Sequence, residues 1–205
     1  MIDLGEIQRR PSKYWNADGL PEVTMGLLWI LWGSAWIVGD SLPRGAASNI
    51  YWTLAPLLLV LTGTAAVWVT KKLKARITFP RAGYVAWHEP TTAQRLTSAA
   101  VAAITATFLA ALVIRARAQG IERVAPAIFG VVFSLGFVVA SLTQQVPHML
   151  ALAGVALMLG LAFAGLNLGW QSTNWMLVGL GTATLLSGIL RLGIFLKRNP
   201  LEHRA

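Results

Sequence analysis

The stretch VPHMLALAGVALMLGLAFAGLNL, residues 146–168, decides the fold class of this chain. It contains no Asp, Glu, Lys or Arg along its whole length. A hydrocarbon core about 30 Å thick needs roughly 20 apolar residues of helix to cross it. Inside lipid every backbone amide and carbonyl must be paired within the segment, which favours a helix over a lone strand. The stretch therefore predicts a transmembrane helix.

Runs of similar length and composition occur along the rest of the chain, at 22–39, 50–70, 95–114, 124–142 and 174–196. Charged residues make up only 12% of the 205 residues, against about 25% in soluble domains. We predict an all-α integral membrane protein, a bundle of about six transmembrane helices. Its expected parts are an N-terminal segment at the cytoplasmic interface, a membrane domain and a cytoplasmic tail, at 1–21, 22–196 and 197–205.

The basic residues predict the orientation, because cytoplasmic loops carry the excess of Lys and Arg. With the N-terminus inside, all but four of the 17 Lys and Arg lie in inner segments. The four exceptions are Arg44, Arg115, Arg117 and Arg123, so the loop 115–123 is the weakest part of this assignment. We expect both termini to be cytoplasmic and the protein to lie in a cell inner membrane.

Charge and composition also exclude several function classes. The net charge of +9 is explained by the basic inner loops, so we expect anionic phospholipids rather than nucleic acid as its partner. The chain has no Cys, which excludes disulfides and thiolate chemistry. None of the eight Asp and Glu residues lies at the centre of a predicted span, which argues against proton-coupled transport.

The stretch KKLKARITFPRAGYVAW, residues 71–87, differs from the rest of the chain. Its lysines are typical of the cytoplasmic end of a span. Beyond them, apolar and polar residues alternate on both sides of Pro80–Gly83, which predicts a short hairpin-like, extended cytoplasmic loop at 71–93. We expect this loop to contact a protein partner or lipid, and its candidate residues are Lys74, Arg76, Arg81 and Tyr84.

Two further sets of residues are candidates for ligand contact. Arg191 is the basic residue deepest in a span, and it either extends to the headgroups or holds an anionic lipid or ligand. The spacing of Trp29, Trp32 and Trp36 places them on one helical face. Such a face either contacts lipid or fills the bundle core, or it binds a quaternary ammonium group or stacks on a quinone.

No catalytic, cofactor-binding or metal-binding residue is predicted. The HEP triplet at His88 lacks the second His of a zinc protease motif, and no Ser lies in a G-x-S-x-G motif. Small residues at Ala99–Ala111 and Ala156–Gly169 predict close helix packing within the bundle or, alternatively, a homodimer contact.

The segments YWNADGLPE, residues 14–22, and KARITFPRAGYV, residues 74–85, resemble paired signatures of a group of small, uncharacterised bacterial multi-spanning membrane proteins. The resemblance implies a bacterial inner-membrane location and no activity. We expect a non-catalytic accessory or sensory membrane subunit. A carrier or channel for an apolar or anionic small molecule is the alternative. An intramembrane lipid-modifying enzyme would be favoured only by a pocket that combines His88 or His148 with a carboxylate.

Overall fold

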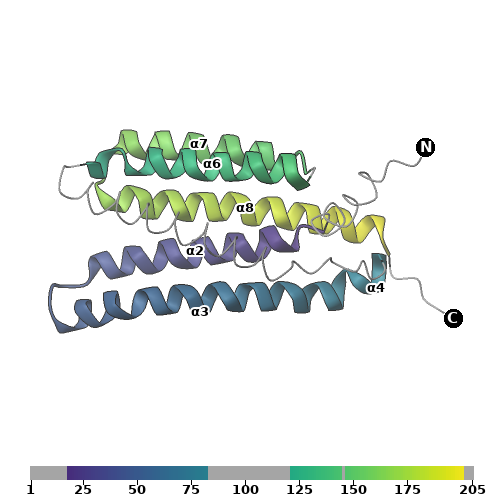
Figure 1. The fold of residues 1–205 in the computed structure, drawn as a ribbon, viewed down its shortest axis with the longest axis horizontal. Coiled ribbons are helices and arrows are strands. Elements are labelled where there is room, and N and C mark those ends of the chain that lie inside the picture. Colours follow the sequence, from purple (N-terminus) through teal and green to yellow (C-terminus); the bar gives the residue numbers. More distant parts are fainter. Residues whose placement is uncertain (1–17, 83–120, 145, 201–205) are drawn as a thin grey trace, which may run out of the picture.

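The computed structural model describes residues 18–82, 121–144 and 146–200, and all regular elements in these ranges are helices. In chain order they are α2 (Leu20–Ser41), α3 (Ala46–Ile77), α4 (Phe79–Ala82), the short helix η1 (Ile121–Arg123), α6 (Ala125–Gln144), α7 (Met149–Leu166) and α8 (Trp170–Arg198). The long helices run side by side, with α8 between α2 and the pair α6–α7, and with α3 on the outer side of α2 (Figure 1).

The bundle has two ends that matter for function. The Glu22 end holds the beginnings of α2 and α7 and the ends of α3, α6 and α8 (Figure 1). The Asp40 end holds the end of α2 and the beginnings of α3, α6 and α8. Asp18 and Arg198 thus lie at the same end of the molecule.

Among the described residues, 5 helices are long and apolar enough to cross a membrane: α2, α3 with α4, α6, α7 and α8. They coincide with five of the six predicted spans, so the prediction of an all-helical membrane protein is confirmed at this level. The remaining predicted span, 95–114, lies outside the described residues.

The predicted hairpin is wrong for the part of 71–93 that the structure describes. Helix α3 continues from Lys71 to Ile77, and α4 begins at Phe79. The run from Lys71 to Ile77 contains neither Gly nor Pro and is rich in good helix formers, so nothing ends the helix at the membrane boundary. Pro80 lies in the first turn of α4, where a missing amide is tolerated. Residues 83–93 lie outside the described part.

Helices α2 and α8 approach each other along a seam of glycines spaced by seven residues. The seam consists of Gly19, directly before α2, Gly26 and Gly33 in α2, and Gly181 and Gly188 in α8. A Cβ added to Gly26 would lie 2.5 Å from the backbone nitrogen of Leu185. Small residues at a seven-residue period keep two helix backbones in contact over several turns. Gly19 also has φ +73, which other residues rarely adopt. The seam fixes the register between α2 and α8.

Helices α6 and α7 pack through the small residues predicted in the fifth span. A Cβ on Gly160 would lie 2.7 Å from the Cα of Gly130, and Ala156 is fully buried. In the described part of the chain no atom lies within 4 Å of a Cβ on Gly165. The packing prediction is therefore confirmed for Ala156 and Gly160 and not for Gly165; the pattern at Ala99–Ala111 lies outside the described residues.

Helix α3 differs from the others because it is almost wholly exposed. Lys74 is its only buried residue, whereas Leu57, Val60 and Leu61 are 56%, 64% and 54% exposed. The core lies instead around Trp29, Ala156, Leu177 and Leu180, where α2, α7 and α8 meet. An exposed apolar helix face is typical of contact with lipid or with another helix.

Candidate functional site

Glu22, His148 and Arg191 form a polar cluster at the Glu22 end of the bundle. Glu22 lies in the first turn of α2, His148 directly precedes α7, and Arg191 lies about two turns before the end of α8. Nε2 of His148 lies 2.6 Å from Oε1 of Glu22, and Nη1 of Arg191 bonds Nδ1 of His148. Nε of Arg191 lies 4.0 Å from Oε2 of Glu22. Three helices distant in sequence thus meet in one charged contact.

The partners of His148 fix where its proton lies. An arginine side chain is always protonated and only donates hydrogen bonds. Nδ1 of His148 therefore accepts from Arg191, and the ring proton is on Nε2, from which it is donated to Glu22. The carboxylate of Glu22 and the guanidinium of Arg191 carry opposite charges, which balance within the cluster.

Two atoms of this cluster have no hydrogen-bond partner among the described residues, Oε2 of Glu22 and Nε of Arg191. Glu22 is only 3% exposed. A buried carboxylate oxygen without a donor costs about 1–3 kcal/mol or more, and such atoms call for an explanation. An acceptor and a donor placed next to each other match a hydroxyl group, which can both donate and accept.

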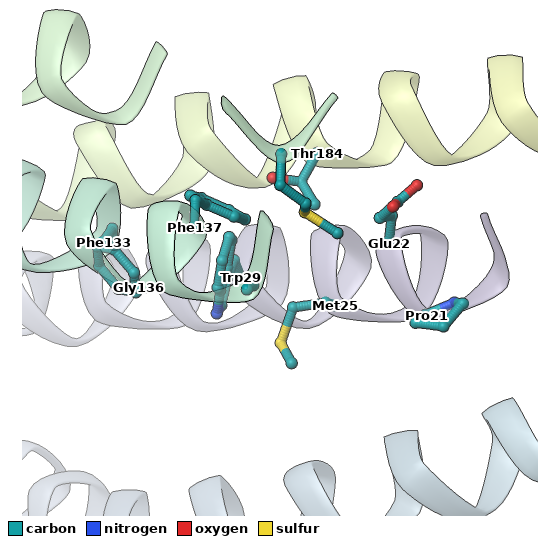
Figure 2. Close-up of a pocket in the computed structure, with 10 residues that line it drawn as sticks. Pro21, Glu22, Met25, Trp29, Phe133, Gly136, Phe137 and Thr184 are labelled. Atoms are coloured by element: carbon teal, nitrogen blue, oxygen red, sulfur yellow. The ribbon is translucent and has the colours of Figure 1, made fainter. Parts of the chain in front are cut away.

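An apolar cavity of about 320 Å³ extends from Glu22 along the α2–α6 contact. Its lining is Pro21, Glu22, Met25, Trp29, Phe133, Gly136, Phe137, Ala140, Met149 and Thr184. Figure 2 shows Glu22 at one end of this lining and Phe133 at the other, with Trp29 and Phe137 between them. The ring of Trp29 lies 5.1 Å from that of Phe133 and 5.9 Å from that of Phe137. The volume is in the range of natural ligand pockets.

A second buried cluster joins the beginning of α2 to the end of α3. The carboxylate of Asp18, which is 0% exposed, accepts three hydrogen bonds. The donors are the backbone amide of Leu20 at 3.1 Å, Nζ of Lys74 at 2.6 Å and Oγ1 of Thr78 at 2.7 Å. A fully buried ion pair adds little net stability, but it fixes which groups lie together. It therefore holds the first turn of α2, and with it Glu22, in place.

The four predicted contact residues have different outcomes in the structure. Lys74 is 1% exposed and is bound to Asp18, so it does not form part of a surface for a partner; the prediction is wrong for this residue because α3 turns it inward. Arg76 is exposed. Arg81 donates from Nη1 to the carbonyl oxygen of Ile77 at 2.8 Å. Tyr84 lies outside the described residues.

Arg191 lies near the end of its span as predicted, but one side of its guanidinium faces protein. It contacts His148 and is 29% exposed. The three tryptophans of the predicted aromatic face lie in different surroundings. Trp29 borders the cavity, Trp32 donates to Oγ1 of Thr62 on α3 at 2.9 Å, and Trp36 lies at the Asp40 end.

Sequence reasoning named His148 as a possible partner of a carboxylate, but it did not identify Glu22 as that carboxylate or connect either residue with Asp18. The available signal was topological: in an up-and-down bundle the first and fifth spans begin on the same side, so Glu22 and His148 are expected near one another. Among the described residues no group of three or more His, Asp or Glu is arranged to hold a metal ion. His88 and His203 lie outside them.

Comparison of the chain with protein-family models, with curated proteins and with solved structures found no match.

Proposed function

We propose that this protein binds a neutral, hydroxyl-bearing lipid in the cavity beside Glu22 and acts as an accessory or sensory membrane subunit. The observation that carries the proposal is Oε2 of Glu22, a buried carboxylate oxygen without a hydrogen-bond partner among the described residues, at the end of an apolar cavity. A lipid hydroxyl would donate to this oxygen and accept from Nε of Arg191.

The charges favour a neutral ligand. Glu22 and Arg191 already balance one another, and a charged headgroup would leave an excess charge in a buried place, at a cost of several kcal/mol. The cavity walls are aromatic and aliphatic, so they suit an acyl or isoprenoid chain. Met25, at the edge of the cavity and 43% exposed, marks a side from which a lipid would enter.

We further propose the finer topology. Thr78, near the end of α3, bonds Asp18 at the Glu22 end, whereas Glu122 of η1 lies near Gly169 at the Asp40 end. A single crossing by 95–114 would join these two ends and supply the sixth span. We place the Glu22 end at the cytoplasmic face of a bacterial inner membrane. There the basic residues of 71–81 other than Lys74, and those of 197–198, would meet anionic phospholipid. Arg76, Arg81 and Tyr84 are the proposed contacts for a partner protein.

Retention of a long-chain alcohol tests the lipid site directly. Protein in nanodiscs that contain 1-hexadecanol, or its methyl ether, is released and weighed by native mass spectrometry. We expect the wild type to retain the alcohol and not the ether, because the ether cannot donate to Glu22. Gly136→Leu, which fills a wall position with open space beside it, should abolish retention. Gly63→Leu on α3, equally open, is the control.

Equal retention of alcohol and ether by the wild type would refute the role of Glu22. Retention of the alcohol by Gly136→Leu at the wild-type level would refute the cavity as the site. Glu22→Leu should lose the preference for the alcohol while the protein stays monodisperse on size-exclusion chromatography.

A second candidate is a lipid-modifying enzyme, and the contact between His148 and Glu22 favours it. Glu22, which accepts a hydrogen bond from His148, is placed to remove the proton from a bound hydroxyl as that oxygen attacks the acyl or phosphoryl group of a donor lipid. The bond between this group and the donor's own oxygen breaks, and Glu22 returns the proton to that leaving oxygen. Incubation of nanodiscs with isotopically labelled donor lipids and analysis of the products tests this candidate. Formation of labelled product by the wild type and not by Glu22→Gln would favour the enzyme over the binding protein.

A further inference from the structure

The Asp40 end carries an aromatic recess that the proposed lipid site does not use. Its volume is about 190 Å³, and its aromatic walls come from four different helices: Trp36 of α2, Trp52 of α3, Phe129 of α6 and Trp170 of α8. Gly39 leaves room for this arrangement, since a Cβ there would lie 3.0 Å from Cζ2 of Trp52. The recess is open at Trp52, which is 40% exposed.

Asp40 gives this recess a negative charge that no basic side chain in the described part of the chain pairs within ion-pair distance. One oxygen, Oδ2, accepts from Nδ2 of Asn174 at 2.8 Å. Asp40 lies in the last turn of α2, which has no basic residue. The carbonyl end of a helix carries a partial negative charge. The helix and the carboxylate therefore act in the same direction and attract a cation.

We propose that this recess binds an organic cation with a quaternary ammonium group. Three indole rings and a phenyl ring line the recess and can attract a cation through their π electrons, and Asp40 supplies the full opposite charge. A quaternary ammonium group donates no hydrogen bond, so it suits walls that offer few acceptors. The side-chain amide of Asn174 is engaged by Asp40. Oγ1 of Thr173, which is 6% exposed, lacks a hydrogen-bond partner among the described residues.

An inorganic cation fits this site less well. A divalent metal ion needs several oxygen ligands at short distance, and Asp40 is the only carboxylate among the described residues of the lining. The volume is too small for a whole lipid or a drug-sized ligand, which occupies about 300 Å³ or more. The recess therefore suits a headgroup-sized cation. This group can belong to a free compound or to the headgroup of a phospholipid.

Binding of choline compared with its uncharged isostere tests the proposal. The wild-type protein is placed in nanodiscs of phosphatidylethanolamine and phosphatidylglycerol, which contain no quaternary ammonium group. Choline or 3,3-dimethylbutan-1-ol is then titrated in, and binding is followed by isothermal calorimetry. We expect saturable choline binding, with the uncharged isostere at least about tenfold weaker because it lacks the cation–π and carboxylate attraction. Equal binding of the two compounds, or no saturable choline binding, overturns the proposal.

Paired variants locate the site. Asp40→Asn should weaken choline binding at least about tenfold, whereas Glu122→Gln, also at the Asp40 end, should leave it unchanged. Trp170→Leu should weaken it, and Trp175→Leu, an exposed tryptophan outside the lining, should not. Asp40→Asn preserves an oxygen for Asn174, so the fold is retained; circular dichroism checks this. Wild-type affinity in both Asp40→Asn and Trp170→Leu overturns the assignment.

The source of the cation is distinguished in a second arm. Nanodiscs are prepared with phosphatidylcholine and phosphatidylethanolamine in equal amounts, and lipids retained by the protein are counted by native mass spectrometry. Retention of phosphatidylcholine that Asp40→Asn abolishes identifies a lipid headgroup as the ligand. Equal retention of the two lipids, with choline still bound in the first arm, identifies a free quaternary ammonium compound.

Discussion

The two ends of the α2–α8 pair differ in how they treat a carboxylate. At the Glu22 end, Glu22 is buried, lies in the first turn of a helix and is accompanied by Arg191 and His148. At the Asp40 end, Asp40 lies in the last turn of the same helix among aromatic rings, with one amide as its partner. The helix dipole favours the first carboxylate and disfavours the second.

Whether the charges of a site are balanced predicts which kind of ligand it binds. A site whose charges already balance gains nothing from a charged ligand and selects by hydrogen bonding. A site with an excess negative charge and aromatic walls selects a cation. The glycine seam joins the two sites, because it sets α2 against α8 so that Glu22 lies near Arg191 and Asp40 lies near Asn174.

The largest expected effect comes from breaking the charge balance at Asp18. Lys74→Met leaves the Asp18 carboxylate buried without its cation, and we expect a loss of about 3–5 kcal/mol in the free energy of unfolding. Denaturant unfolding in detergent measures this loss. The double variant Asp18→Asn, Lys74→Met should recover most of it. Lys72→Met, whose ammonium lies exposed over the ring of Trp68, is the control and should change stability little.

Next in size is the effect of Glu22→Gln. It removes the charge that compensates Arg191 and weakens a charged hydrogen bond to His148, so we expect a loss of about 1.5–3 kcal/mol. The same unfolding measurement applies. A variant as stable as the wild type would mean that Glu22 and Arg191 do not depend on each other.

The seam itself is broken by Gly26→Ala. A Cβ there meets backbone atoms of α8 that cannot move aside, and overpacking of this kind costs about 1–3 kcal/mol. Both the alcohol retention and the choline affinity should fall, since both sites depend on the α2–α8 register. Gly193→Ala, in the same bundle with open space beside it, should keep both. Loss at one site only would show that the seam does not couple the two ends.

The smallest effect has the opposite sign. Asp40→Asn, measured without an organic cation, should stabilise the fold by about 0.3–1 kcal/mol, because a charge unfavourable to the helix dipole is removed. Addition of choline should then stabilise the wild type and not the variant. Thermal unfolding in the nanodiscs used above measures both. If Asp40→Asn destabilised the fold, Asp40 would be a carboxylate that stabilises the bundle, as Glu22 is expected to be.

The sequence predicted the spans well and the sites poorly. An apolar run such as 146–168 predicts a span by itself, because side chains that face lipid are apolar whichever helices lie beside them. The prediction of a hairpin at 71–93 was wrong in its described part. An alternation of apolar and polar residues over four positions is a weak signal, and α3 continues because no Gly or Pro ends it before Ile77. Lys74 was expected on the surface because its charge indicated the membrane boundary. It lies instead on the face of α3 that is directed toward Asp18.

The sequence by itself therefore determined that the helices lie in lipid, that the fold is helical, and where the described spans approximately end. These properties depend on local hydropathy and length. Only the tertiary structure decided that Glu22 meets His148, 126 residues away in the chain, and that Trp36, Trp52 and Trp170 line one recess with Asp40. The physical reason is that these contacts depend on register and rotation between helices. Those are set by the close approach of glycines such as Gly26 and Gly181, and hydropathy does not encode them.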